Sequence, residues 1–122
     1  MSYTVVRETV NYTMVLNRQI DRVAEAISNL DLTTRMTGRK RLLALVNAVD
    51  GLYILTKSIP AVKIADYDDI LEKILVAVIN DRLGDVGGTL NTVKALKKIA
   101  SECIAALYRA KLLIQIEYLP QG

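Results

Sequence analysis

The chain contains no histidine, no phenylalanine and no tryptophan, and only one cysteine and two prolines among its 122 residues. Histidine is the commonest general base and metal ligand, so its absence argues against acid–base enzymes and against di-iron bundles built on Glu-x-x-His pairs. A single cysteine forms neither an intrachain disulfide nor a multi-cysteine zinc site. We therefore expect a protein that is not an enzyme and that binds no metal or cofactor.

The lone cysteine and the first residues also bear on location. Cys103 has apolar neighbours and no histidine to activate it, so we expect a buried core thiol. Without a disulfide framework or a secretory signal at its start, the chain is expected in the cytoplasm. The apolar stretch 42–59 is interrupted by Asn47, Asp50 and Lys57, so it predicts a buried helix and not a membrane span. The composition as a whole is typical of a thermophile.

Because phenylalanine and tryptophan are missing, the interior has to be aliphatic. Hydrophobic residues make up 52% of the chain and charged residues 24%, which predicts one domain, residues 1–122, with a real core. Apolar side chains recur every three or four positions, as in amphipathic helices, and no stretch alternates as a strand does. The expected helices are residues 4–30, a second that ends at Pro60, a third from Asp66 to about residue 82, and a fourth over 89–118.

Each expected helix has an apolar seam that it would bury against the others. The main seam residues are Leu16, Ile20, Val23 and Leu30, then Leu42, Leu45, Val49 and Leu52, then Ile70, Leu71, Ile74, Leu75, Val78 and Ile79, and finally Val93, Leu96, Ala100, Cys103 and Leu107. Leu43 is expected to widen the second seam. Four such helices with short connections predict an all-α, antiparallel, up-down-up-down four-helix bundle.

Several residues are expected to mark the helix ends. Thr33, Thr34 or Thr37 is a candidate cap for the start of the second helix, and Gly84 is the expected glycine that follows the third. Gly51 falls inside the second helix, where it marks either close packing of another backbone or a tolerated surface glycine.

Charge is distributed unevenly along the chain. The net charge is +3, but residues 33–58 carry five basic and one acidic side chain, residues 59–87 carry three and six, and residues 88–122 carry five and two. In an up-down bundle the second and fourth helices start at the same end. Cations near helix N-termini oppose the helix dipole, and rules of this kind are broken where function requires it. The expected phosphate-binding residues at this end are Arg35, Arg39, Lys40, Arg41, Arg82, Lys94, Lys97 and Lys98.

Two classes of function remain open. The first is a nucleic-acid-associated protein, or a subunit of a nucleoprotein complex, that binds the phosphate backbone without base-specific reading. The second is a protein–protein adaptor or structural subunit with no nucleic-acid role, whose charges serve solubility. The acidic cluster at Asp66, Asp68, Asp69 and Glu72 could hold Mg²⁺ together with a substrate phosphate, but capping of the third helix explains it more simply.

The last helix has apolar residues on two faces. On a helical wheel Ala105, Leu112 and Ile116 point away from the seam. Apolar side chains on an outer face are typical of a subunit contact. We therefore expect a homo-oligomer, or a partner protein, at this face.

Overall fold

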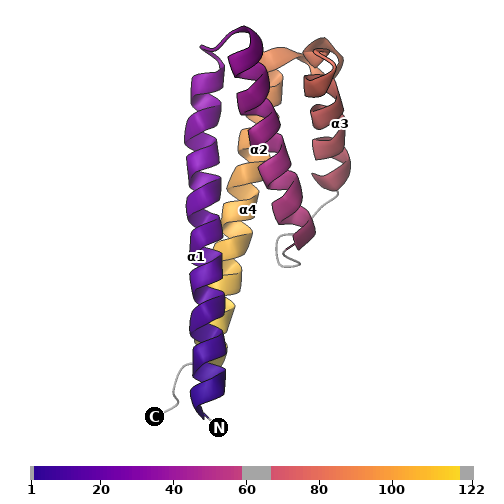
Figure 1. Ribbon diagram of the computed structural model, residues 1–122. Helices are drawn as coiled ribbons and strands as arrows, with labels where there is room; N and C mark the ends of the chain where they lie inside the picture. The colour runs from indigo at the N-terminus through magenta and orange to yellow at the C-terminus, as the bar shows by residue number, and fades with distance from the viewer. Residues whose placement is uncertain (1, 59–66, 119–122) are drawn as a thin grey trace.

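The computed structural model describes the backbone of residues 2–58 and 67–118, and the side chains of residues 12–57 and 67–114. It contains four α-helices, α1 (Ser2–Thr33), α2 (Gly38–Ser58), α3 (Tyr67–Ile79) and α4 (Gly88–Tyr118), and a short 3₁₀ helix, η2 (Leu83–Val86) (Figure 1). The part of the chain that is described contains no strand. The predicted all-α class and the four predicted helices are confirmed.

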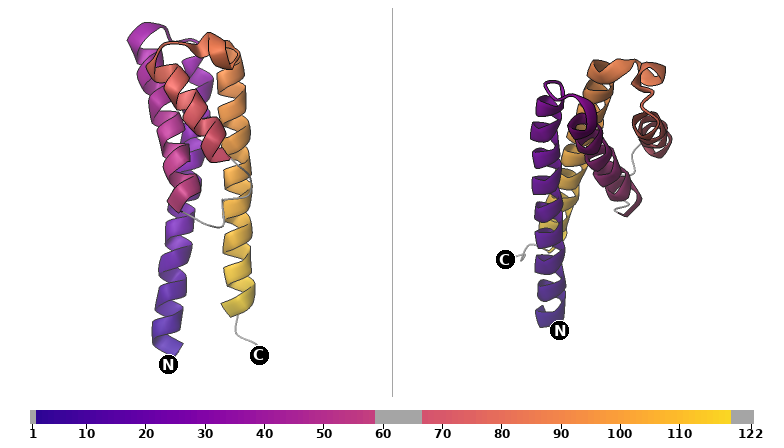
Figure 2. Two further views of the ribbon diagram at one scale, coloured as in Figure 1. Left: turned by 90° about the vertical axis from the view of Figure 1, so that its right-hand side faces the viewer. Right: turned by 45° about the horizontal axis from the view of Figure 1, so that its top comes forward.

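Consecutive helices run in alternating directions along the bundle (Figure 1). The end of α1 lies beside the start of α4, where Lys97 Nζ and Asp31 Oδ1 are 2.6 Å apart. The end of α2 lies beside the start of α3, where the Thr56 hydroxyl donates to Asp68 Oδ1 at 2.8 Å. The closest packing joins α1 to α4 and α2 to α3, and α3 touches α4 only slightly (Figure 2). The bundle is thus two helix pairs that meet mainly through α1 and α2.

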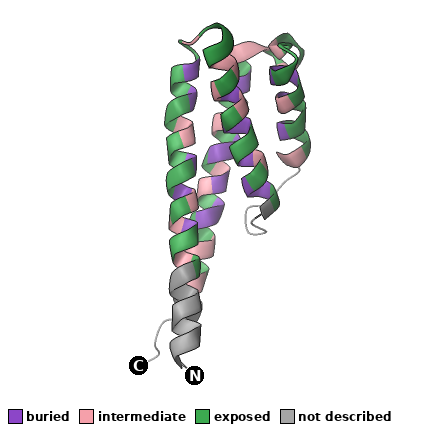
Figure 3. Cartoon of the chain, viewed as in Figure 1, coloured by how far each residue is buried: buried purple, intermediate pink, exposed green. Residues whose placement is uncertain are grey.

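The core is aliphatic and follows the predicted seams. The fully buried side chains include Leu16 and Leu30 of α1, Leu45 of α2, Leu71 of α3 and Leu107 of α4. Figure 3 shows buried positions, coloured purple, on all four helices. Burying one such leucine contributes about 1.5–3 kcal/mol. Cys103 belongs to the same cluster, as expected.

Some residues predicted for the seams of α2 and α3 are exposed. These are Leu43 of α2 and Ile70 and Ile79 of α3. An apolar stripe wide enough for two neighbours needs a helix on each side, but α3 packs chiefly against α2. The edges of its stripe therefore face solvent.

The end of α3 differs from the predicted glycine stop. Asp81 adopts the left-handed conformation, with φ 53°, and its N–H bonds to Val78 O at 3.2 Å. The N–H of Arg82 bonds to Ala77 O at 2.7 Å, so two of the free carbonyls at the helix end are satisfied in a Schellman-type turn. Gly84 instead lies within η2. The prediction failed because an aspartate tolerates this conformation better than most side chains.

Two of the threonines expected to cap α2 belong to the end of α1. The hydroxyls of Thr33 and Thr34 donate to the carbonyls of Leu30 and Asp31 at 2.7 and 3.0 Å. Within α2, a Cβ built at Gly51 would meet no heavy atom within 4 Å. Of the two readings of this glycine, close packing against another part of the described chain is therefore wrong.

Candidate anion-binding end of the bundle

The first turn of α2 carries three cations and no carboxylate. The helix begins at Gly38, which has φ 60°, a left-handed conformation that glycine adopts without steric cost. Arg39 and Lys40 are exposed, and Arg41 is half-buried. The free N–H groups of a helix start carry partial positive charge, so these side chains and the backbone favour an anion together.

Arg39 and Arg41 line one cleft. The cleft has a volume of about 450 Å³ and lies between the first turns of α2 and the turn that follows α3. Leu42 and Leu45 form its α2 side, and Val78, Asp81 and Leu83 form the opposite side. The charged residues that line the cleft are Arg39 and Arg41 on the α2 side and Asp81 on the opposite side. The cleft therefore has a net positive lining of one charge.

The start of α4 is built on two glycines. Gly87 and Gly88 have φ 94° and 90°, and the Asn91 amide donates to Gly87 O at 2.9 Å. A Cβ at Gly87 would lie 2.9 Å from the Asn91 amide nitrogen, so a larger residue would displace this side chain. The first turn of α4 has no carboxylate either.

The lysines of α4 follow in its second and third turns and face two directions. Lys97 is paired with Asp31 of α1, with side chains 38% and 61% exposed respectively. Lys94 and Lys98 are exposed and lie one turn apart on the outer face of α4. Only these two point freely outward from this helix start.

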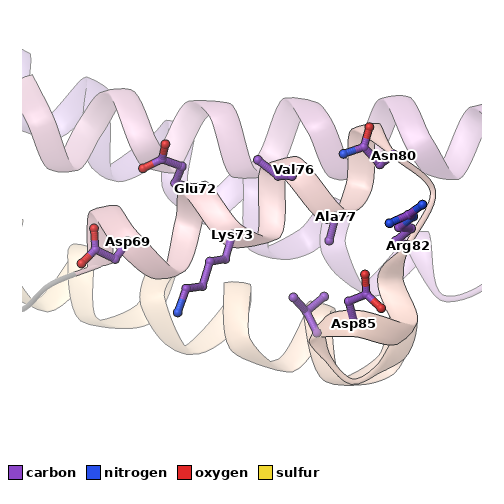
Figure 4. Close-up of a pocket in the computed structure, with 9 residues that line it drawn as sticks. Asp69, Glu72, Lys73, Val76, Ala77, Asn80, Arg82 and Asp85 are labelled. Carbon is purple, nitrogen blue, oxygen red and sulfur yellow. The ribbon is translucent and has the colours of Figure 1, made fainter.

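Arg82 lies in a different cleft from Arg39 and Arg41. It lines a hollow of about 620 Å³ beside α3 and η2, where Asp85 is its neighbour and Glu72 and Lys73 lie further along (Figure 4). The side chains of this hollow have mixed charge and do not favour an anion. Arg35, in the turn between α1 and α2, is exposed.

The eight predicted cations therefore gather at one end of the bundle but do not form one surface. One group is Arg39 and Arg41 in their cleft, with Lys40 beside them in the same turn. The second is Lys94 and Lys98 on α4, while Lys97 is held by Asp31 and Arg82 faces another hollow. Their shared end follows from the direction of the helices, and their separation follows from the rotation of each helix about its axis.

The start of α3, which lies beside the far end of α2, carries the acidic cluster. Asp68 accepts the Thr56 hydrogen bond, which ties α3 to α2, and Asp66 lies outside the described residues. Lys57 Nζ lies 4.4 Å from the Tyr53 ring centre. Its pKa is raised, first by Tyr53 and then by Asp68 and Glu72. No cluster of three or more metal-ligating side chains occurs in the described part of the chain.

The only thiol is packed inside the bundle. Cys103 is 1% exposed. Burial raises its pKa to about 11, and the charge of Glu102 acts in the same direction. A thiol is nucleophilic as the thiolate, so this cysteine is inert at neutral pH.

Two of the three predicted oligomer-interface residues are exposed on the outer face of α4. These are Ala105 and Leu112, while the side chain of Ile116 lies outside those described. Tyr108, which the prediction left out, is 53% exposed. It lies three residues after Ala105 and four before Leu112, and this spacing places it beside them.

None of the described helices has the length and apolar character that crossing a lipid bilayer requires.

Comparison with known proteins adds no relative whose function would inform that of this chain. No protein-family model, no curated protein and no solved structure matches the chain.

Proposed function

We propose that this protein is a small, non-enzymatic, nucleic-acid-associated protein, or a subunit of a nucleoprotein complex, that binds the phosphate backbone through the basic end of its bundle. The proposal includes an intracellular location, where such a partner is found. One observation carries it: α2 and α4 both start at this end, neither has a carboxylate in its first turn, and basic side chains follow each start.

The cations at the helix starts destabilise the free protein and would stabilise a complex with an anion. A cation near a helix start costs about 0.3–1 kcal/mol when exposed at low salt. Lys40 in the first turn of α2 is exposed and has no ion-pair partner among the described residues. A bound phosphate would reverse the sign of this cost, because it would meet the side chains and the helix N–H groups together. Binding of this kind reads the backbone and not the bases.

The chemistry of the side chains supports binding rather than catalysis. The chain has no histidine, and its one thiol is buried with a raised pKa. A nucleophile with an adjacent base is the usual sign of covalent catalysis. Among the described residues, the hydroxyl that bonds to a carboxylate is that of Thr56, which donates to Asp68, and Thr56 is 2% exposed and so out of reach of a substrate.

The test measures affinity for a fluorescent single strand and a duplex across a salt series, by anisotropy. Each phosphate contact contributes about 0.9 to the slope of log K against log salt on duplex DNA. We expect Arg39→Gln/Arg41→Gln to weaken binding of every sequence alike and to lower the slope by about 2. The matched control, Arg18→Gln/Lys73→Gln, removes the same charge from exposed sites away from that end and should change the slope little.

Three outcomes would overturn the proposal: no binding at low salt, equal loss in both double variants, or no loss in either. The first would favour the adaptor function that the sequence left open. The second would indicate attraction to the net charge alone, without a site at this end.

A further inference from the structure

The outer face of α4 carries a second stripe in addition to the buried seam. Its members are exposed and follow one another at spacings of four, three and four: Ser101, Ala105, Tyr108 and Leu112. Leu112 is 56% exposed. A spacing of three and four keeps residues on one side of a helix over several turns, as in a coiled-coil seam. We call these four residues the outer stripe.

The bundle does not need the outer stripe for its own core. The opposite face of α4 already supplies Ala100, Cys103 and Leu107, each at most 1% exposed. α1 packs along α4 on the inner side, and the contacts of α2 and α3 are also made there. The outer stripe is thus a surface of three apolar side chains and one serine that no described part of the chain covers.

We infer that the outer stripe pairs with the outer stripe of a second copy of this chain, with the two α4 helices antiparallel. A twofold interface brings the same patch together from both copies, so it has to be complementary to itself. The outer stripe meets this condition where Leu112 faces Ala105, and the lysines that precede it favour the same direction. The inference goes beyond the proposed function and does not depend on it.

The side chains of the outer stripe differ in size along its length. Along the outer stripe the small residues Ser101 and Ala105 come first, and the large residues Tyr108 and Leu112 follow. If a twofold axis passes between residues 108 and 109, Leu112 of each copy lies opposite Ala105 of the other. Each Leu112 then meets an alanine, and the contact occurs twice, while the two Tyr108 side chains lie next to each other at the axis. A parallel pair would instead place alanine against alanine, which leaves a gap.

Exposed positive charge lies at one end of the outer stripe. Lys94 and Lys98 precede the outer stripe on the same face and are exposed. A parallel pair would put the lysines of both copies side by side, where they repel. The antiparallel pair separates them and brings Lys98 next to the end of the other α4, which finishes at Tyr118. The free carbonyls of a helix end attract a cation.

The first experiment measures mass by sedimentation equilibrium without nucleic acid. We expect the wild type to reach twice the 13.5 kDa chain mass. Leu112→Glu should weaken the dimer at least roughly a hundredfold, because symmetry inserts two charges and each tenfold step corresponds to 1.4 kcal/mol. The control, Leu43→Glu, changes a leucine that is 54% exposed on α2 and should leave the mass unchanged. Both side chains are exposed in one chain, so circular dichroism should show both variants folded.

The second experiment tests direction by disulfide formation in a Cys103→Ala background. A disulfide needs Cα atoms within about 7 Å. Untagged chains that carry Ala105→Cys are mixed with affinity-tagged chains that carry Leu112→Cys. Under mild oxidation the two kinds of chain should cross-link to each other. Neither variant alone should cross-link efficiently, because equal positions lie about 10 Å apart along an antiparallel pair, at 1.5 Å per residue.

A wild type that stays monomeric at hundreds of micromolar would overturn the inference. So would a dimer that survives Leu112→Glu, or homodimeric cross-links at both positions in place of the mixed one. These results are separable from the test of the anion site, because the outer-stripe variants leave Arg39 and Arg41 in place and the Arg39 and Arg41 variants leave the outer stripe intact.

Discussion

The two halves of α4 are alike on the face that packs inside the bundle and differ on the face that is turned away from it. Inside, Val93 and Leu96 of the first half and Cys103 and Leu107 of the second are buried in one continuous seam. Outside, the first half presents Lys94 and Lys98 and the second presents Ala105, Tyr108 and Leu112 of the outer stripe. Burial against α1 does not require this difference, because the inner seam is alike in both halves. The two proposals above give each half its own partner beyond the bundle, an anion for the first half and a second copy for the second half.

The largest expected effect tests whether the inner faces are equivalent. Leu96→Ala and Leu107→Ala each remove a side chain that is 0% exposed, one from each half. We expect each to lower the free energy of unfolding by about 2–5 kcal/mol in urea denaturation, through lost burial and the cavity left behind.

Leu90→Ala is the control, since Leu90 is exposed in the first half of α4. An exposed position should change the free energy of unfolding by no more than about 0.5 kcal/mol. A loss below about 1 kcal/mol at Leu107 alone would mean that the second half of α4 is poorly packed, and the two inner faces would then not be equivalent.

A smaller effect concerns Cys103, near the point where the two halves join. In the folded protein the pKa of the thiol is about 11, whereas in the unfolded chain its pKa is near the ordinary value of 9.0. Between these values the unfolded chain has lost a proton that the folded chain keeps, so stability falls as pH rises. The contribution of the neutral thiol to the free energy of unfolding is complete below pH 9, and the free energy of unfolding decreases by up to about 2–3 kcal/mol by pH 11.

The measurement compares urea denaturation of the wild type and Cys103→Ala at pH 8, 9, 10 and 11. Lysines and tyrosines titrate in both proteins, so the difference between the two curves reports the thiol. If both proteins lose stability equally, Cys103 is not buried in the way described, and the inner seam is open to water where the halves join.

The sequence predicted the inner seams better than the outer surfaces, and the reason is physical. Burial against a neighbouring helix imposes a period of three and four, and Leu16, Leu45 and Leu107 obey it. Where α3 has one close neighbour instead of two, the same rule overestimated burial, as at Ile79. Turn chemistry misled in one place, because Asp81 takes the conformation that the rule reserves for glycine.

The sequence predicted at which end of the bundle the candidate site lies, but not the direction in which its cationic side chains point. The order and direction of the helices were enough to bring the starts of α2 and α4 to one end. Whether Arg82 points toward Arg39 or into another hollow depends on the turn after α3, which rests on two backbone hydrogen bonds, from Asp81 and Arg82. No local pattern encodes that rotation.

The smallest expected effect decides to which face Lys97 belongs. Its ion pair with Asp31 is 2.6 Å long but exposed on both sides. Asp31→Asn should therefore lower the free energy of unfolding by about 1 kcal/mol or less, and the loss should vanish near 1 M salt. The same change frees a cation beside Lys94 and Lys98. Affinity for nucleic acid should then rise, with a slope of log K against log salt that is steeper by up to about 1.

Asp21→Asn is the matched control, because it removes an exposed carboxylate of α1 that has no ion-pair partner among the described residues. If Asp31→Asn raises affinity and Asp21→Asn does not, Lys97 is a member of the anion-binding end that Asp31 restrains. If both changes raise affinity equally, the gain comes from net charge, and Lys97 serves only to hold the start of α4 against α1. In that case the first half of α4 would contribute only Lys94 and Lys98 to binding.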